Sequence, residues 1–275
     1  MSLTKYVSYA SQSFTLPDIC LRIRDILDDH RSDADDIARL ISVDPSLTAK
    51  ILRLANSALF RFPSQIGSIS KAVNVIGGEA LYNLVVAETA NTAFTQFNSP
   101  LINPDQHWRN SVFCGMVAKY LAKHCRIRGI ERFFVMGILQ NLSELVVAKC
   151  SPEKYEAYLN DDSDLLPWVK QLSHFKFTFA HCSGTIMESW RLPLSLYFPV
   201  VHLHNDKQKV VDAEIAVLAI AVRTLFNEQQ EDDNNKIELI SPELEKIIKI
   251  EKETINDAIH YSRRETDMIA SLVRQ

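Results

Sequence analysis

Residues 41–58 have the sequence ISVDPSLTAKILRLANSA. In this stretch Asp44 can cap exposed helical amides, and Pro45 at the first helical position loses no hydrogen bond. Apolar residues then recur at the spacing of one helix face, at Leu47, Ile51, Leu52 and Ala55. The stretch therefore predicts a helix that begins at Asp44-Pro45 and ends near Asn56-Ser57.

The segments on either side have the same helical character. Upstream, Leu16-Pro17 opens one predicted helix, and Ser32 stands as an N-cap before a second helix with acids in its first turn. Downstream, residues 61–68 form a loop, and Ser68 or Ser70 caps a further helix. Gly77-Gly78 ends that helix by allowing a left-handed residue, and residues 79–94 form the next one.

The rest of the chain is predicted to be helical as well. Two prolines in residues 98–104 suggest a boundary between lobes. The helices expected beyond it are 105–124, 131–149, 152–159, 167–174, 178–190, 193–204 and 210–226. Residues 227–236 are highly polar and predict a mobile loop, followed by helices from Ser241 and from Glu251. The expected units are residues 1–98, 99–226 and 227–275.

Composition supports an all-α fold. Hydrophobic residues make up 47% of the 275 residues and charged residues 23%, which suffices for a real core. The chain has only 7 glycines, too few for the tight turns of an all-β domain.

Charge and patterning argue against several classes of protein. The net charge is -4, and the basic pairs Arg126/Arg128 and Lys207/Lys209 are short, so we expect no nucleic-acid partner. The start of the chain lacks the layout of a signal peptide. The longest apolar run, residues 215–222, is less than half a membrane span, so no membrane association is expected. The 5 cysteines form no CxxC pair, which favours reduced thiols, a cytoplasmic protein and no zinc cluster.

Four stretches together resemble the HDOD family, the HD-related output domains of bacterial signalling proteins. They are residues 41–58, residues 68–85, Trp108-Arg109-Asn110-Ser111, and His181 followed by Ser189-Trp190-Arg191-Leu192-Pro193. The resemblance runs from about residue 16 to residue 226. It implies an N-terminal helical lobe over residues 1–98, an HD-like helical lobe over 99–226, and C-terminal helices that pack on the domain.

HDOD domains are similar to HD phosphohydrolases, which hold a divalent metal with histidines and aspartates. Such a metal makes a nucleophilic hydroxide and neutralises phosphoryl charge. The resemblance implies that Asn110 occupies the first histidine position, and that Gln140 and Asn141 replace the His-Asp doublet. Near the expected late aspartate the chain has only Leu218-Ala219-Ile220-Ala221. Amides are poor substitutes for charged ligands, so we expect no metal, no cofactor and no catalytic residue.

Histidines remain at His181, His202 and His204. Together with Asn110, Gln140 and Asn141 they form a candidate vestigial cleft. A remnant metal or phosphate pocket is one interpretation, and imidazoles that cap or fill a polar cleft between helices are the favoured one.

Three functions follow from the resemblance. The leading hypothesis is a non-catalytic signalling module that binds a signalling protein partner or a small phosphorylated ligand. The first alternative is a metal-dependent phosphohydrolase acting on a nucleotide or cyclic dinucleotide, which rests on fold analogy alone. The second is a nucleotide sensor that has lost hydrolysis.

Overall fold

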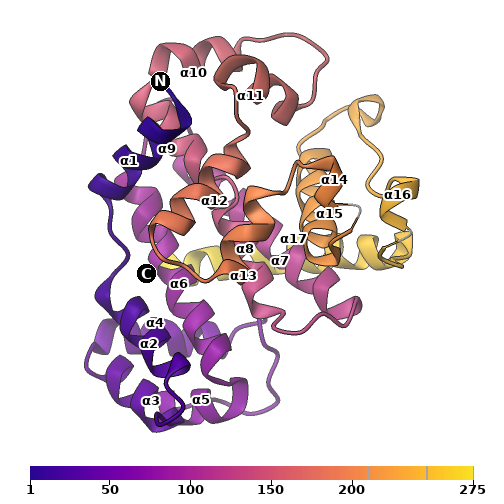
Figure 1. The fold of residues 1–275 in the computed structure, drawn as a ribbon. Coiled ribbons are helices and arrows are strands. Elements are labelled where there is room, and N and C mark those ends of the chain that lie inside the picture. Colours follow the sequence, from indigo (N-terminus) through magenta and orange to yellow (C-terminus); the bar gives the residue numbers. More distant parts are fainter. Residues whose placement is uncertain (210, 246, 275) are drawn as a thin grey trace.

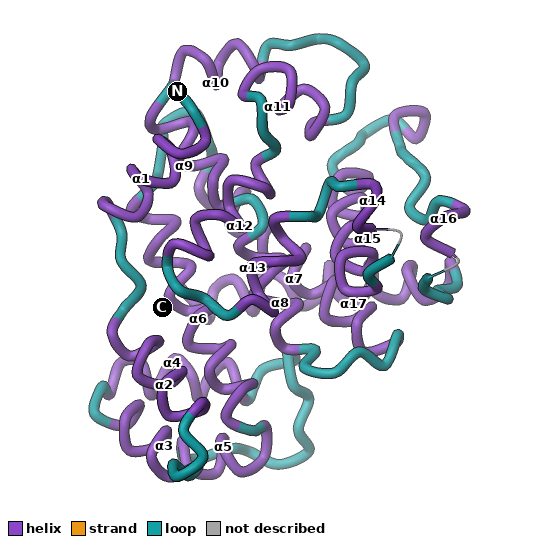
Figure 2. Tube along the Cα trace, in the orientation of Figure 1, coloured by secondary structure: helices purple, strands orange, loops and turns teal. Residues whose placement is uncertain are grey.

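The computed structural model describes residues 1–209, 211–245 and 247–274. Within these residues every regular element is a helix (Figures 1 and 2), which confirms the all-α prediction. The helices are α1 (Leu3–Ser13), α2 (Asp18–Asp28), α3 (Ala34–Ser42), α4 (Pro45–Ala55), α5 (Ile69–Ile76), α6 (Gly78–Gln96), α7 (Pro104–His124), α8 (Glu131–Leu139), α9 (Leu142–Cys150), α10 (Pro152–Leu159), α11 (Pro167–Phe175), α12 (Phe179–Ser189), α13 (Leu194–Val201), α14 (Asp206–Lys209), α15 (Ala213–Glu228), α16 (Pro242–Glu245) and α17 (Lys252–Arg274), with a 3-10 turn at Asp233–Asn235.

Local capping signals placed several helix ends correctly. The backbone N–H of Leu47 donates to Asp44 Oδ1 at 3.0 Å, and Pro45 is the first residue of α4. Ser68 caps α5, and Gly77 ends it with a φ of 87°. The cap of α3 was predicted one residue too early. Asp33, and not Ser32, accepts from the first-turn amides, because it forms a reciprocal capping box with Asp36.

The Asn56 side chain closes the loop that follows α4. Its Nδ2 donates to the carbonyl oxygens of Leu52 and Ile66, both at 2.8 Å, while its Oδ1 accepts from the Ile66 amide at 2.7 Å. The loop between α4 and α5 is therefore held at both ends by one amide group.

Helices from distant parts of the chain pack together. In Figure 1, α2 to α5 gather at the bottom, and α9 to α12 lie towards the top. The first helix, which was not predicted, contacts α9 and α12, and Tyr6 donates to Ser151 Oγ at 2.8 Å. The last helix lies along α7, where Trp108 Nε1 donates to the Ala270 carbonyl at 3.0 Å. Part of residues 1–98 thus packs on helices of residues 99–226, and the division into three units stays a prediction.

The segment predicted as one helix over residues 131–149 is two helices. The α-helical hydrogen bonding of α8 ends at Leu139, Gln140 and Asn141 form a turn, and α9 starts at Leu142. In the first turn of α9 the Ser143 amide donates to Ser183 Oγ at 2.9 Å, and Ser143 Oγ donates to the Phe179 carbonyl at 2.7 Å. These bonds tie the start of α9 to α12, so the two amide side chains lie at a bend.

One further prediction needs correction. The helix expected over residues 210–226 continues to Glu228, and its expected start at residue 210 lies outside the described residues. The polar segment after it contains the 3-10 turn and is closed by Asn227, whose side chain exchanges two hydrogen bonds with the backbone of Ile237.

Among the described residues one segment, Glu131–Cys150, is long and apolar enough to cross a membrane by length and composition, a feature that was not predicted from the sequence. However, 78% of its most apolar window is buried inside the protein. Its apolar character is that of a core segment.

Candidate functional site

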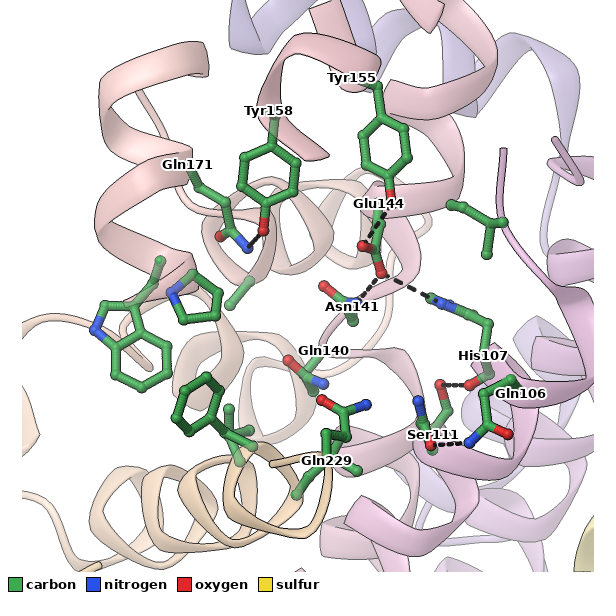
Figure 3. Close-up of a pocket in the computed structure, with 18 of the residues that line it drawn as sticks. Gln106, His107, Ser111, Gln140, Asn141, Glu144, Tyr155, Tyr158, Gln171 and Gln229 are labelled. Carbon is green, nitrogen blue, oxygen red and sulfur yellow. Dashed lines mark hydrogen bonds and ion pairs between the residues drawn. The ribbon is translucent and has the colours of Figure 1, made fainter. Parts of the chain in front are cut away.

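A cavity of about 380 Å³ opens between α7, the turn after α8, and helices α9, α10, α11 and α15 (Figure 3). The described residues of its lining are mostly neutral: amide side chains, aromatic rings and two imidazoles surround a single carboxylate, that of Glu144. The polar and aromatic lining residues are Asn103, Gln106, His107, Asn110, Ser111, Gln140, Asn141, Glu144, Tyr155, Tyr158, Trp168, Gln171, His204, Phe226 and Gln229.

The structure brings four of the six sequence-predicted site residues to this cavity, namely Asn110, Gln140, Asn141 and His204. His181 and His202 are not among the residues that line it. His181 is exposed on α12. Partial burial, together with the nearby His202, lowers its pKa. The ring of His202 packs on Phe198 with centroids 4.5 Å apart. The six residues therefore do not form one cleft.

Glu144 is the centre of a hydrogen-bonded cluster that the sequence did not reveal. His107 Nδ1 lies 3.3 Å from Glu144 Oε2, and the Tyr155 hydroxyl donates to Oε1 at 2.8 Å. Asn141 Nδ2 donates to Oε2 as well. Burial by itself would raise the pKa of Glu144, but the polar contact and charge interaction with His107, together with the hydrogen bonds from Tyr155 and Asn141, outweigh it and lower the pKa.

Helical spacing could have pointed to this cluster. Glu144 follows Asn141 by three positions, and His107 precedes Asn110 by three, so each shares a helix face with a predicted site residue. Tyr155 belongs to α10, and no local signal connects it with α7. A helical-wheel argument from the predicted site residues could therefore have identified Glu144 and His107, but not Tyr155.

Gln140 differs from the other amides because it is buried although its side chain has no hydrogen-bond partner among the described residues; the Gln229 side chain also lacks one, but that residue is exposed. The side chain of Asn110 accepts from Gln106 at 2.7 Å, and Gln171 Oε1 accepts from the Phe179 amide at 2.8 Å. The backbone N–H of Gln140 donates to the Met136 carbonyl at 2.9 Å, and the residue is only 6% exposed. Figure 3 shows its amide group beside Asn141 and Gln229, directed into the cavity.

Aromatic rings form another part of the lining. Trp168 stacks on His204 with centroids 4.8 Å apart and planes 13° apart, and the edge of Phe226 meets Trp168 at 6.2 Å. Tyr158 accepts a long hydrogen bond of 3.5 Å from Gln171, and burial raises its pKa to about 12, so it is a neutral phenol at physiological pH. The cavity therefore offers flat apolar surface next to uncharged polar groups.

The donor set does not fit a divalent metal of the HD type. Asn110, Gln140 and Asn141 supply neutral amides, and Glu144 already accepts two hydrogen bonds and lies 3.3 Å from His107 Nδ1. Residues 218–221 are buried in α15 and carry no ligand. Across the described parts of the chain, no group of three or more His, Cys, Asp or Glu side chains is placed to hold a metal ion. A divalent cation needs several charged oxygens or imidazoles that converge, and this cavity lacks them.

Three comparisons extend this description. The family model of the HDOD domain matches residues 14–206. A protein from Shewanella amazonensis SB2B, named as a candidate phosphohydrolase, has a similar structure with a TM-score of 0.72, 19% identity and 98% of each chain covered. A protein from Marinobacter aquaeolei VT8, named as a candidate signal transduction protein, gives a TM-score of 0.68 at 17% identity, with 95% of this chain and 60% of that chain covered.

A protein of uncharacterized function from Treponema pallidum (strain Nichols) is 25% identical over 221 residues. The matched region is 78% of this chain and 42% of that protein, so the chain spans less than half of that relative's length. The structural similarities define a class of all-helical domains with one common fold. Since the family model covers most of the sequence, the chain belongs to the HDOD family.

Proposed function

We propose that this HDOD domain is a cytoplasmic signal-transduction module that works by binding a ligand or a protein partner, without metal-dependent hydrolysis. The observation that carries the proposal is that the carboxylate of Glu144 is already bonded to other side chains. The one carboxylate among the described lining residues contacts His107 and accepts hydrogen bonds from Tyr155 and Asn141. A carboxylate whose oxygens already accept these bonds stabilises the cavity wall and has little capacity left for a metal ion.

The geometry of α7 supports a role in signalling. Its first turns carry Gln106 and Asn110 at the cavity, and near its other end Lys119 Nζ donates to the Leu59 carbonyl at 2.7 Å. Leu59 lies in the loop after α4, so one helix connects the cavity with the N-terminal helices. A ligand that favours one placement of α7 would bias the packing at both ends.

The cytoplasmic part of the proposal is supported by the cysteines. All five are free, and Cys20, Cys114 and Cys182 are buried. Burial raises the pKa of Cys20 to about 11 and that of Cys114 to about 12, so these thiols stay protonated and unreactive.

The competing function is that of a phosphohydrolase, as the name of the Shewanella relative suggests, and the resemblance to HD phosphohydrolases implies that it would depend on a metal. The test is metal analysis of protein purified without chelators or a metal-affinity step. It is combined with hydrolysis assays on nucleotides and cyclic dinucleotides in the presence of magnesium, manganese or iron. A metal-loaded HD phosphohydrolase serves as the positive control. We expect no stoichiometric metal and no turnover above the protein-free rate.

Two variants locate any activity that is found. Asn141→Ala alters the cavity, whereas His181→Ala alters an exposed position outside its lining. Bound metal together with turnover that is lost in Asn141→Ala and kept in His181→Ala would overturn the proposal.

A further inference from the structure

We infer that the cavity binds an uncharged, planar heterocycle of the nucleobase kind, and that Gln140 recognises its hydrogen-bonding edge. This inference rests on the proposed function, because it treats the cavity as a binding site without hydrolysis. It departs from the phosphorylated ligand expected from the sequence, and three features of the cavity carry it.

The first feature is the unpaired amide of Gln140. The Gln140 residue is only 6% exposed, and its side chain has no hydrogen-bond partner among the described residues. Its amide atoms are not among the fully buried unpartnered ones, so they are accessible from the cavity, where another molecule can satisfy them. An amide presents one acceptor and one donor side by side. This pattern is complementary to the edge of a nucleobase, as in bidentate pairing of glutamine with adenine. A carboxylate or phosphate ligand would accept from Nε2 but leave the carbonyl oxygen without a donor.

The second feature is the aromatic wall. Trp168 is fixed by its stacking on His204 and by the edge of Phe226, so it lines the cavity in a defined orientation. Fixed aromatic faces suit planar bases, which gain stacking energy with little regard to the identity of the base. The wall would supply affinity, and Gln140 would supply selectivity.

The third feature is the charge of the lining. Among the described residues no lysine or arginine lines the cavity, so a phosphate group would meet no fixed positive charge from them there. An adjoining hollow shares Gln106 and Asn110 with the cavity and contains Arg109 and Arg263. Each of these arginines is already paired, Arg109 with Asp267 at 3.3 Å and Arg263 with Glu228. A phosphate in the hollow would have to compete with those carboxylates, and it would gain little.

The volume agrees with such a ligand. The cavity of about 380 Å³ lies at the lower end of the range of roughly 300–1,000 Å³ that is usual for small-molecule sites. A base or nucleoside is a better match to that space than a dinucleotide.

The experiment is isothermal titration calorimetry of the full chain with adenosine, guanosine, cytidine and uridine, and with the four corresponding 5′-monophosphates. We expect at least one nucleoside to bind saturably, and its monophosphate to bind no more than a few-fold tighter. Gln140→Leu should weaken the binding of that nucleoside by about 10-fold or more, because the paired donor and acceptor are lost. Trp168→Leu should weaken the binding of every nucleoside that binds by a similar factor.

The matched control is Gln96→Leu, which changes an exposed glutamine of α6 outside the cavity and should leave binding unchanged. Thermal unfolding of each variant shows whether it is folded at the titration temperature. The inference is overturned if no nucleoside saturates the wild-type protein, if the monophosphates bind at least about 10-fold tighter, or if Gln140→Leu binds as well as Gln96→Leu. If one of these outcomes occurs, and the metal and hydrolysis assays detect neither bound metal nor turnover, the inference about the nucleobase fails while the proposed function remains supported.

Discussion

The Nδ1 atom of His107 lies 3.3 Å from Oε2 of Glu144, which joins the start of α7 to α9 at the wall of the cavity. The ring of His107 is only 7% exposed and packs on Phe94 with centroids 5.2 Å apart. Its Nε2 is buried and has no hydrogen-bond partner among the described residues. The orientation of the imidazole is therefore set by one polar contact, the contact with Glu144.

Replacing Glu144 by leucine should destabilise the fold. The substitution leaves His107, Tyr155 and Asn141 without their acceptor inside a largely buried cluster. Unsatisfied buried polar groups of this kind cost about 2–4 kcal/mol in total. Glu144→Gln keeps an acceptor for Tyr155 and should cost less. Urea unfolding of both variants checks this prediction, and equal stability of wild type and Glu144→Leu would contradict it.

The same cluster predicts a dependence of stability on acidity. Because the pKa of Glu144 in the folded protein lies below its ordinary value of 4.5, the folded state binds fewer protons than the unfolded state at pH values between the two. The stabilising contribution is thus present above pH 4.5 and is lost as the pH falls through the folded-state pKa. The difference in unfolding free energy between wild type and Glu144→Gln should shrink between pH 6 and pH 3. If the difference in unfolding free energy between the two proteins stays constant from pH 6 to pH 3, the role given to Glu144 is wrong.

The parts of the fold that the sequence predicted are those with local causes. Asp44 and Ser68 cap helices through amides three residues away, so the residue type and its position suffice. The bend at Gln140 and Asn141 could not be predicted in this way. It depends on Ser143 bonding to α12, some 40 residues further along the chain.

The candidate site shows the same division between local and distant causes. Asn110, Gln140 and Asn141 were found because a family motif marks their positions, and the structure places them in one cavity. Tyr155 escaped notice, because its contact with Glu144 arises only when α10 packs on α9. His181 was grouped with the site by motif alone, although its side chain lies on the exposed side of α12.

Lys119 predicts a second dependence of stability on pH, which arises from a buried base and not from a carboxylate. Its ammonium group lies over the Phe60 ring at 4.1 Å and 3.9 Å from Glu131 Oε1. Burial, opposed by Glu131 and reinforced by Lys123, lowers its pKa from 10.5 to about 8. The unfolded state therefore binds more protons between pH 8 and pH 10.5, and the penalty for the buried charge is relieved as the pH rises through that window.

Removing the Lys119 charge should therefore have its most favourable effect on the unfolding free energy at neutral pH, where the folded protein carries the penalty for the buried charge. The unfolding free energy of Lys119→Met relative to wild type should fall by on the order of 2–3 kcal/mol between pH 7 and pH 10. Denaturant unfolding at several pH values measures this difference. The exposed Lys5→Met serves as control and should show no such trend. A constant difference for Lys119→Met would refute the effect.

The close crossing of α7 and α8 gives the last prediction. A Cβ atom added at Gly137 would lie 2.4 Å from the Cα atom of Gly115, and one added at Gly115 would lie 2.6 Å from the Phe134 carbonyl oxygen. These obstacles are backbone atoms, which no rotamer change can move, so the two helices must separate to admit a methyl group. Gly137 precedes Gln140 by three residues, and the displacement would therefore reach the cavity wall.

We expect Gly137→Ala to lower the unfolding free energy by about 1–3 kcal/mol, the usual cost of overpacking, despite the better helix propensity of alanine. Gly67→Ala is the matched control, since a Cβ atom there would have no neighbour within 4 Å. Thermal or urea unfolding compares the two variants under the same conditions. If Gly137→Ala proves as stable as Gly67→Ala, α7 and α8 are not packed so closely that only glycine fits at their crossing. The position of Gln140 would then have to be set by the bonds of Ser143 to α12 alone.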